Sequence, residues 1–401
     1  MPAIPSPLLY GTGAVLALAL AGWSSADALS RSARASAPEF ARKVAPWNAA
    51  SLGTQGAAVL MRTEDPTASR RARAIAAAAI RRGDLSASTL RTAALAESAV
   101  GNGDRAARLI GLAQRLSRRD LLTQIWYIEH YSAAGDVRRT LDHYEIALTT
   151  SRSALQLLYP VLVGAAADPA LTPEIGKFML RNRGRPWWQP MMGALIGEST
   201  DPRAAAQIAR IALKPGPGED RALVKTAIAR LVAVQAFDEA SRLYAGMARG
   251  NAKAPDSVGD GGFERDPALP PFDWELAEDG NVRSQRGPAP AGREGNVLWI
   301  DADGGVRTVV VSQLLKLAPG AHQLSAVVGA TGDGEDSHLL FAMRCAVGES
   351  ADQLIDVTPS ASAVRTVRGS YTVPAGCAWQ RLSVQVSGAH VGTWIDDIRL
   401  R

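Results

Sequence analysis

The spacing of apolar residues divides the chain into two parts. From residue 68 to residue 250, alanine- and leucine-rich stretches repeat with the 3.6-residue period of an α-helix, with short breaks between them. Breaks such as Gly83-Asp84, Gly135-Asp136 and Asp168-Pro169 are typical of tight turns between paired helices. We therefore predict an all-α region over residues 40–250.

After Gly250 the pattern changes to short alternating segments. Residues 251–271 are rich in Pro, Gly and Asp and are predicted to form a linker with the first strand region, and the sandwich is predicted over residues 258–401. The predicted strands are Phe272–Leu276, Asn296–Ala302, Val306–Ser312, His322–Gly329, Leu339–Cys345, Ala363–Val373, Trp379–Ser387 and Gly392–Leu400. These strands, separated by turn residues, indicate an antiparallel all-β sandwich.

A 34-residue repeat is visible within the helical region. Four positions recur one repeat later: Gly101, Ala106, Ile110 and Ala113 become Gly135, Thr140, Tyr144 and Ala147. A looser third copy is Ala240, Tyr244 and Met247. The spacing resembles the tetratricopeptide repeat (TPR), although the early Trp and closing Pro of that family are missing from both best copies. The resemblance implies a solenoid that binds protein partners on its concave surface.

Several aromatic residues of this region have two interpretations. They either line the concave surface or belong to the helical core, and they are Trp126, Tyr127, Tyr131 and Tyr144.

The C-terminal part resembles the jelly-roll fold of galactose-binding-like and carbohydrate-binding modules. The similarity lies in Val306–Gln313, in the Leu317-Ala-Pro-Gly turn with the strand after it, and in the closing Trp394–Leu400 with its Asp pair. It implies a glycan ligand, whose sugar rings would stack on aromatic side chains. The candidates are Trp274, Trp299, Trp379 and Trp394, some of which are expected to be core residues instead.

The same resemblance implies a possible structural calcium ion. Its ligands would be Glu264, in the opening Gly-Phe-Glu, and the closing Asp396 and Asp397. Oxygen ligands from both chain ends suit a hard cation that joins the terminal strands. The alternative is that these carboxylates are exposed turn residues.

The N-terminus has the layout of an export signal. Residues 8–23 are uncharged and largely apolar, and the small residues Ala26-Asp27-Ala28 follow. We predict a signal peptide or membrane anchor over residues 1–28, with membrane anchoring through residues 8–23 possible. No Lys or Arg precedes this segment, whereas Arg31 and Arg34 follow it, so a reversed, cytoplasm-facing orientation stays open.

Composition and cysteine content narrow the function. Residues 29–257 hold 32 Lys and Arg against 20 Asp and Glu, but the arginines are spread along helices without a basic cluster, which argues against nucleic-acid binding. Cys345 and Cys377, the two cysteines of the chain, suit one disulfide in an oxidising compartment, or two structural thiols. The expected location is the periplasm or cell envelope.

No catalytic motif is found, so we predict a non-enzymatic protein. The nucleophile elbow, the phosphate-binding loop, the His-Glu-x-x-His zinc pair and the Cys-x-x-Cys pair are all missing. The expected function is that of an envelope scaffold, with helices binding protein partners and the jelly roll binding glycan during surface polysaccharide assembly or export. The alternatives are a purely structural or oligomerisation protein without sugar binding and a glycan-active enzyme.

Overall fold

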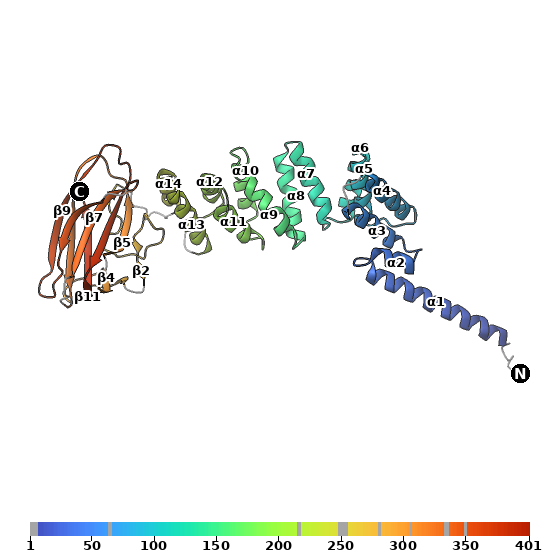
Figure 1. The fold of residues 1–401 in the computed structure, drawn as a ribbon, viewed down its shortest axis with the longest axis horizontal. Helices are drawn as coiled ribbons and strands as arrows, with labels where there is room; N and C mark the ends of the chain where they lie inside the picture. Colours follow the sequence, from blue (N-terminus) through green and yellow to red (C-terminus); the bar gives the residue numbers. More distant parts are fainter. Residues whose placement is uncertain are drawn as a thin grey trace. The chain divides into compact units, whose positions relative to one another are not determined.

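The computed structural model describes residues 7–62, 66–214, 218–247, 256–279, 282–304, 307–332, 337–348 and 351–401. Helices form its N-terminal part and a two-sheet sandwich its C-terminal part, which confirms the predicted fold class (Figure 1). The chain divides into two compact units, Met1–Leu158 and Tyr159–Arg401. The second unit therefore contains helices as well as the whole sandwich.

The first unit is built from helices joined by short turns. They are α1 (Pro7–Ala33), α2 (Pro38–Val44), α3 (Ala49–Arg62), α4 (Pro66–Arg81), α5 (Ala87–Ala99), α6 (Gly103–Leu116), α7 (Leu121–Ala133) and α8 (Val137–Thr150). The next helix, α9 (Ala154–Ala165), spans the boundary between the units. Among the residues in the described ranges, no helix is both long and apolar enough to cross a membrane.

Glycines and capping side chains end these helices where the sequence predicts turns. Gly83, Gly101 and Gly135 have φ angles of +91°, +84° and +71°, in the left-handed region that is strained for residues with a Cβ atom. Asp136 begins α8, because its carboxylate accepts a hydrogen bond from the backbone N of Arg139 at 3.0 Å.

The 34-residue repeat corresponds to equivalent packing positions. Ala106, Ile110 and Ala113 are fully buried on α6, and Tyr144 and Ala147 are buried at the matching positions of α8. Small residues let neighbouring helices approach closely, and the bulky residue fills the space between them. The repeat in sequence is therefore a repeat in packing.

A buried carboxylate on α5 ties three helices together. Glu97 is 3% exposed and accepts a hydrogen bond from Asn102 at 2.6 Å. Its Oε1 also pairs with Arg73 of α4 at 3.3 Å and Arg105 of α6 at 3.2 Å. The buried charge is thus paired from both neighbouring helices.

The second unit begins with further helices. They are α10 (Thr172–Arg181), α11 (Trp188–Gly197), α12 (Pro202–Ala212), α13 (Glu219–Ala233) and α14 (Phe237–Met247). Trp187 and Trp188 belong to their core, since Trp187 stacks on Phe178 at 5.6 Å and Trp188 Nε1 donates to Met179 O at 2.6 Å.

The sandwich consists of two antiparallel sheets. Its strands are β1 (Glu275–Leu276), β2 (Glu278–Asp279), β3 (Val282–Pro288), β4 (Asn296–Asp303), β5 (Thr308–Leu315), β6 (Gly320–Ala330), β7 (His338–Cys345), β8 (Ala351–Val357), β9 (Arg365–Val373), β10 (Gln380–Ser387) and β11 (Ala389–Leu400). One sheet, here called sheet A, has the order β1-β5-β10-β7-β8, and the other, sheet B, has the order β2-β3-β4-β11-β6-β9.

The two sheets enclose one apolar core, in which Leu298 and Ile395 of sheet B lie with Phe341 and Leu382 of sheet A. The predicted strands all fall within or beside observed ones, although Val306 at the start of one lies outside the described residues. Three strands were not predicted, β2, β3 and β8. Strand β3 lacks the alternation of apolar and polar residues that predicts a strand, because its inward residue Ser284 is polar. Ser284 donates hydrogen bonds to Ala277 O and Val310 O, each at 2.9 Å.

Within the second unit, α14 packs against the end of the sandwich. Tyr244 of α14 contacts the Phe272 ring at 5.1 Å and donates its hydroxyl to Asp273 at 2.9 Å. Asp238 of α14 accepts hydrogen bonds from Lys316 at 2.7 Å and from Trp379 Nε1 at 3.2 Å. The last helix is therefore part of the same packed body as the strands.

Candidate functional site

The outward face of sheet A carries a row of five residues, one from each strand. The strand register aligns Glu275, Ser312, Ser383, Ala342 and Gln353. Because side chains alternate along a strand and the adjacent Phe341 and Val384 lie in the core, this row faces away from it. Ser312, Ser383 and Ala342 are 4%, 9% and 5% exposed, so short side chains lie low in the middle of the row.

Longer side chains flank the row. Arg381 and Arg344 lie directly opposite each other on β10 and β7, two positions beyond Ser383 and Ala342, and Gln385 lies two positions away in the other direction. Arg381 donates to Glu275 Oε2 and to Ser312 Oγ, each at 3.0 Å. The ion pair and hydrogen bonds thus hold Arg381 against one end of the row.

A second polar cluster lies at the other edge of the sheet. His338 Nδ1 of β7 lies 2.7 Å from Asp356 Oδ1 of β8, and Gln353 donates to the other oxygen of Asp356 at 3.4 Å. Both ends of the face therefore carry hydrogen-bonding groups, and its middle carries serines and alanine. This pattern of donors and acceptors suits a ligand rich in hydroxyl groups.

The four candidate tryptophans differ in exposure. Trp274, Trp379 and Trp394 are 2%, 5% and 2% exposed, so their rings are enclosed by protein, whereas Trp299 is half-buried. Trp274 stacks on Phe263 at 5.3 Å. None of these four tryptophans belongs to sheet A: Trp299 and Trp394 lie opposite each other on β4 and β11 of sheet B, and the other two lie in loops.

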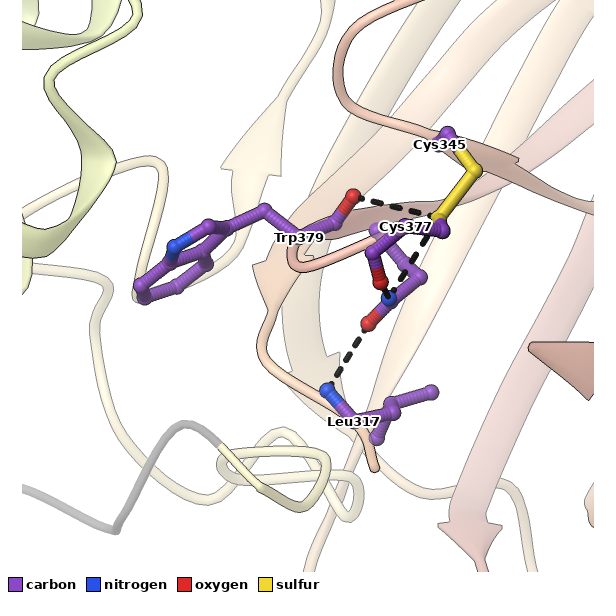
Figure 2. Close-up of a disulfide and its surroundings, with 5 residues drawn as sticks. Leu317, Cys345, Cys377 and Trp379 are labelled. Carbon is purple, nitrogen blue, oxygen red and sulfur yellow. Dashed lines mark hydrogen bonds between the residues drawn. A yellow bond between two sulfur atoms is a disulfide. The ribbon is translucent and has the colours of Figure 1, made fainter. Parts of the chain in front are cut away.

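Figure 2 shows the Trp379 ring pointing away from the neighbouring disulfide. The ring lies 6.1 Å from Phe237 of α14 and 5.8 Å from Phe272, with the Lys316 ammonium 5.4 Å from its centre. Hydrogen bonding to Lys316 is the main cause that lowers the pKa of Asp238 below its usual value. Trp379 in this structure is a packing residue for α14.

Two of the three predicted calcium ligands, Glu264 and Asp396, lie near one glycine. A side chain at Gly262 would contact Asp396 Oδ1 at 3.7 Å and Glu264 Cγ at 3.8 Å, so the opening and closing segments do come together. Glu264 accepts from the side chain of Asn296 at 2.9 Å and from its backbone N at 3.1 Å, and these hydrogen bonds lower its pKa.

The Asp pair is already bound by a cation of the protein itself. Arg293 donates to Asp396 at 2.7 Å, lies 3.4 Å from Asp397 and covers the Trp394 ring at 5.5 Å. Nowhere in the described ranges do three or more His, Cys, Asp or Glu side chains group so as to hold a metal ion. The residues present therefore do not fit the calcium site that the resemblance implied.

The helical unit carries a cluster of aromatic rings on α7 and α8, here called the α7–α8 cluster, with Trp126, Tyr127, His130, Tyr131 and His143. Trp126 stacks on His130 at 4.8 Å, and Tyr127 stacks on His143 at 4.4 Å. His130 is exposed and the other four are half-buried, whereas Tyr144, the fourth aromatic named from the sequence, is buried. The cluster thus has both packed and accessible ring surface.

Electrostatics at the cluster follow from its partial burial. His143 Nδ1 lies 2.8 Å from Gln124 Oε1, and burial is the largest effect that lowers the pKa of His143. Burial also raises the pKa of Tyr127 above its usual value, with Tyr131 adding to the effect. Arg139 lies over the Tyr131 ring at 5.3 Å. The cluster therefore combines aromatic rings with an arginine.

The predicted disulfide is confirmed. Cys345 and Cys377 are bonded at 2.07 Å, joining the end of β7 to the loop before β10. Gln380 holds the same loop, because it donates to Cys377 O and accepts from Leu317 N at 2.8 Å (Figure 2).

In a comparison with solved structures, the sandwich is the part of this chain that is similar to known proteins. It resembles the CBM22-1 xylan-binding domain from Paenibacillus barcinonensis Xyn10C, at 19% identity and a TM-score of 0.29, covering 37% of this chain and 96% of that domain. A family 4 carbohydrate-binding module is 16% identical, with a TM-score of 0.27 and coverage of 36% and 97%.

A further similar structure is a family 11 carbohydrate-binding module from Clostridium thermocellum in complex with a mixed-linked tetrasaccharide. It is 14% identical, with a TM-score of 0.23 and coverage of 33% of this chain and 89% of that module. No protein-family model matches the chain, and no curated protein matches it. Similarity at this level describes a fold and does not transfer a ligand.

The five-residue row was not found from the sequence. Its signal is present in β10, where Arg381, Ser383 and Gln385 alternate with core residues. The order of strands in the sheet was needed to place Glu275 and Gln353 at the ends of the same row.

Proposed function

We propose that this protein is a non-catalytic scaffold of the cell envelope, in which sheet A binds a polysaccharide and the helices bind a protein partner. The process proposed is assembly or export of a surface polysaccharide. The observation that carries the glycan part is the five-residue row with its flanking Arg381 and Gln385. It supports sugar binding because charged and amide groups flank a centre of short side chains, so that the hydroxyl groups of a sugar would meet both donors and acceptors.

Glycan-array binding by the full-length protein tests this part. Ser383→Trp fills the low centre of the row, and Arg381→Gln removes its main charged donor. Each change is expected to weaken glycan binding at least tenfold, which corresponds to about 1.4 kcal/mol. Arg368→Gln, at an exposed position on β9 of sheet B, is the matched control and is expected to leave binding unchanged.

A flat array for the unmodified protein would contradict the glycan part. If the protein then formed a stable dimer, the purely structural function would be favoured. Turnover of a polysaccharide that disappears on replacement of a single carboxylate would instead indicate the enzymatic alternative.

The α7–α8 cluster supports the proposal of a protein partner. Half-buried aromatic rings beside an arginine resemble the residue types that carry binding energy in interfaces. Cross-linking in the native envelope is expected to give a defined partner that is lost in Trp126→Ala/Tyr131→Ala and retained in Leu157→Ala, an exposed apolar residue outside the cluster. Equal cross-linking by both variants would show that the α7–α8 cluster is not part of the interface with the partner.

The disulfide supports the envelope location, because such bonds persist in oxidising compartments. Mass spectrometry of the native mature protein tests the location by giving its N-terminus and thiol state together. Export predicts an oxidised Cys345–Cys377 pair, with the chain beginning after residue 28 if the leader is removed. Two free thiols in the native protein would contradict export.

A further inference from the structure

Two arginines oppose each other beside the five-residue row. Arg381 of β10 and Arg344 of β7 are directly paired in the register, and their neighbours Leu382 and Met343 are in the core, so both face outward on sheet A. Cβ atoms at such positions are about 5 Å apart, and like charges placed there are destabilising. The fold therefore carries an unfavourable pair of charges at its candidate site.

Charge compensation is unequal between the two arginines. Arg381 is 21% exposed and pairs with Glu275 at 3.0 Å. Arg344 is exposed, and none of the ion pairs formed among the described residues includes it. The carboxylate at the far edge of the face, Asp356, is hydrogen-bonded to His338. With respect to the described residues, the Arg344 guanidinium thus keeps its hydrogen-bond donors available beside the row.

We propose that Arg344, with Arg381 beside it, binds a carboxylate of an acidic polysaccharide whose sugar residue lies on the five-residue row. This inference rests on the proposed glycan function and names its substrate class. A guanidinium matches a carboxylate with two parallel hydrogen bonds, and an anion between two arginines removes their repulsion. Ser383 and Ala342 lie next to the arginine pair on the same strands, so the ring and the carboxylate of a uronic acid have adjacent places.

The test compares acidic polymers with their neutral counterparts. Full-length protein is titrated with polygalacturonate, alginate and hyaluronate, with the same three polymers after reduction of their carboxyl groups, and with neutral xylan. The expected result is binding to at least one acidic polymer that is at least tenfold tighter than to its reduced form. Arg344→Gln is expected to lower that affinity about tenfold, and Arg368→Gln on sheet B to leave it within twofold.

The possible results distinguish failure of the acidic-ligand inference from failure of the proposed glycan binding. Equal affinity for an acidic polymer and its reduced form, or binding to xylan alone, overturns the acidic-ligand inference and leaves glycan binding standing. Equal losses in Arg344→Gln and Arg368→Gln show non-specific charge attraction and overturn it as well. Binding to none of the seven polymers overturns both. Far-ultraviolet circular dichroism of each variant shows that the fold is retained, since both replaced side chains are exposed.

Discussion

At the scale of single residues, Arg293 supplies the positive charge that the resemblance to carbohydrate-binding modules assigned to a calcium ion. It brings a positive charge to Asp396 and Asp397 and covers Trp394 on the outside of sheet B. Asp396 is 6% exposed, so its carboxylate is nearly buried beside that partner. The sequence analysis assigned the closing Asp pair to a calcium ion, and an arginine 103 residues earlier in the sequence gave no signal of its role.

Replacement of Arg293 by Gln is expected to destabilise the second unit by about 2 kcal/mol, because a nearly buried carboxylate is left without its ion pair. Urea unfolding measures the change. Arg399→Gln is the matched control, since Arg399 pairs with the same Asp397 at 2.9 Å in an exposed position and is expected to cost less than about 1 kcal/mol. Equal losses in the two variants would show that burial of Asp396 does not matter.

His143 makes the stability of the first unit depend on pH. Its folded-state pKa lies below the usual 6.5, mainly because of burial, so the unfolded chain binds a proton first as the pH falls. Stability is therefore expected to decrease as the pH drops below about 6.5. His143→Gln is expected to reduce the difference in Tm between pH 7.5 and pH 5.5, and an unchanged difference would show that His143 contributes nothing to it.

At the scale of elements, the success of sequence analysis depended on apolar alternation. Strand β10 alternates clearly and was predicted, whereas β3, Val-Arg-Ser-Gln-Arg-Gly-Pro, has one apolar residue and buries a serine instead. Sequence analysis named Trp379 as a candidate for sugar stacking because it could not show that α14 covers the ring. The contact joins Trp379 to Asp238 of α14, which is 141 residues earlier in the sequence. Contacts of such sequence separation leave no periodic pattern.

The disulfide fixes the loop that carries Trp379. Cys345 and Cys377 are 32 residues apart. Closing a loop of this length lowers the conformational entropy of the unfolded chain and thereby raises its free energy by about 3 to 4 kcal/mol. Cys345→Ser/Cys377→Ser is expected to lower the unfolding free energy of the second unit by that order in urea titrations. A reducing agent is expected to destabilise the unmodified protein and leave the variant unchanged. Insensitivity of the unmodified protein would contradict a stabilising role for the bond.

At the scale of the whole molecule, the second compact unit includes the helices from Tyr159 onward together with the sandwich. A fragment of residues 159–401 is therefore expected to unfold cooperatively. A fragment of residues 256–401 lacks α14, exposes Phe272 and Trp379, and is expected to be less stable and to self-associate. Urea unfolding and size-exclusion chromatography check both, and equal behaviour of the fragments would show that α14 adds nothing to the sandwich.

The Cys345–Cys377 bond also has a practical consequence for recombinant production. A bacterial host with a reducing cytosol would deliver the chain with two thiols, and the Pro374–Trp379 corner would then lack its covalent tie to β7. Samples made in that way would differ from the native protein at the corner where α14 docks. Secretion into an oxidising compartment of the host, or refolding in a glutathione redox buffer, would remove the difference.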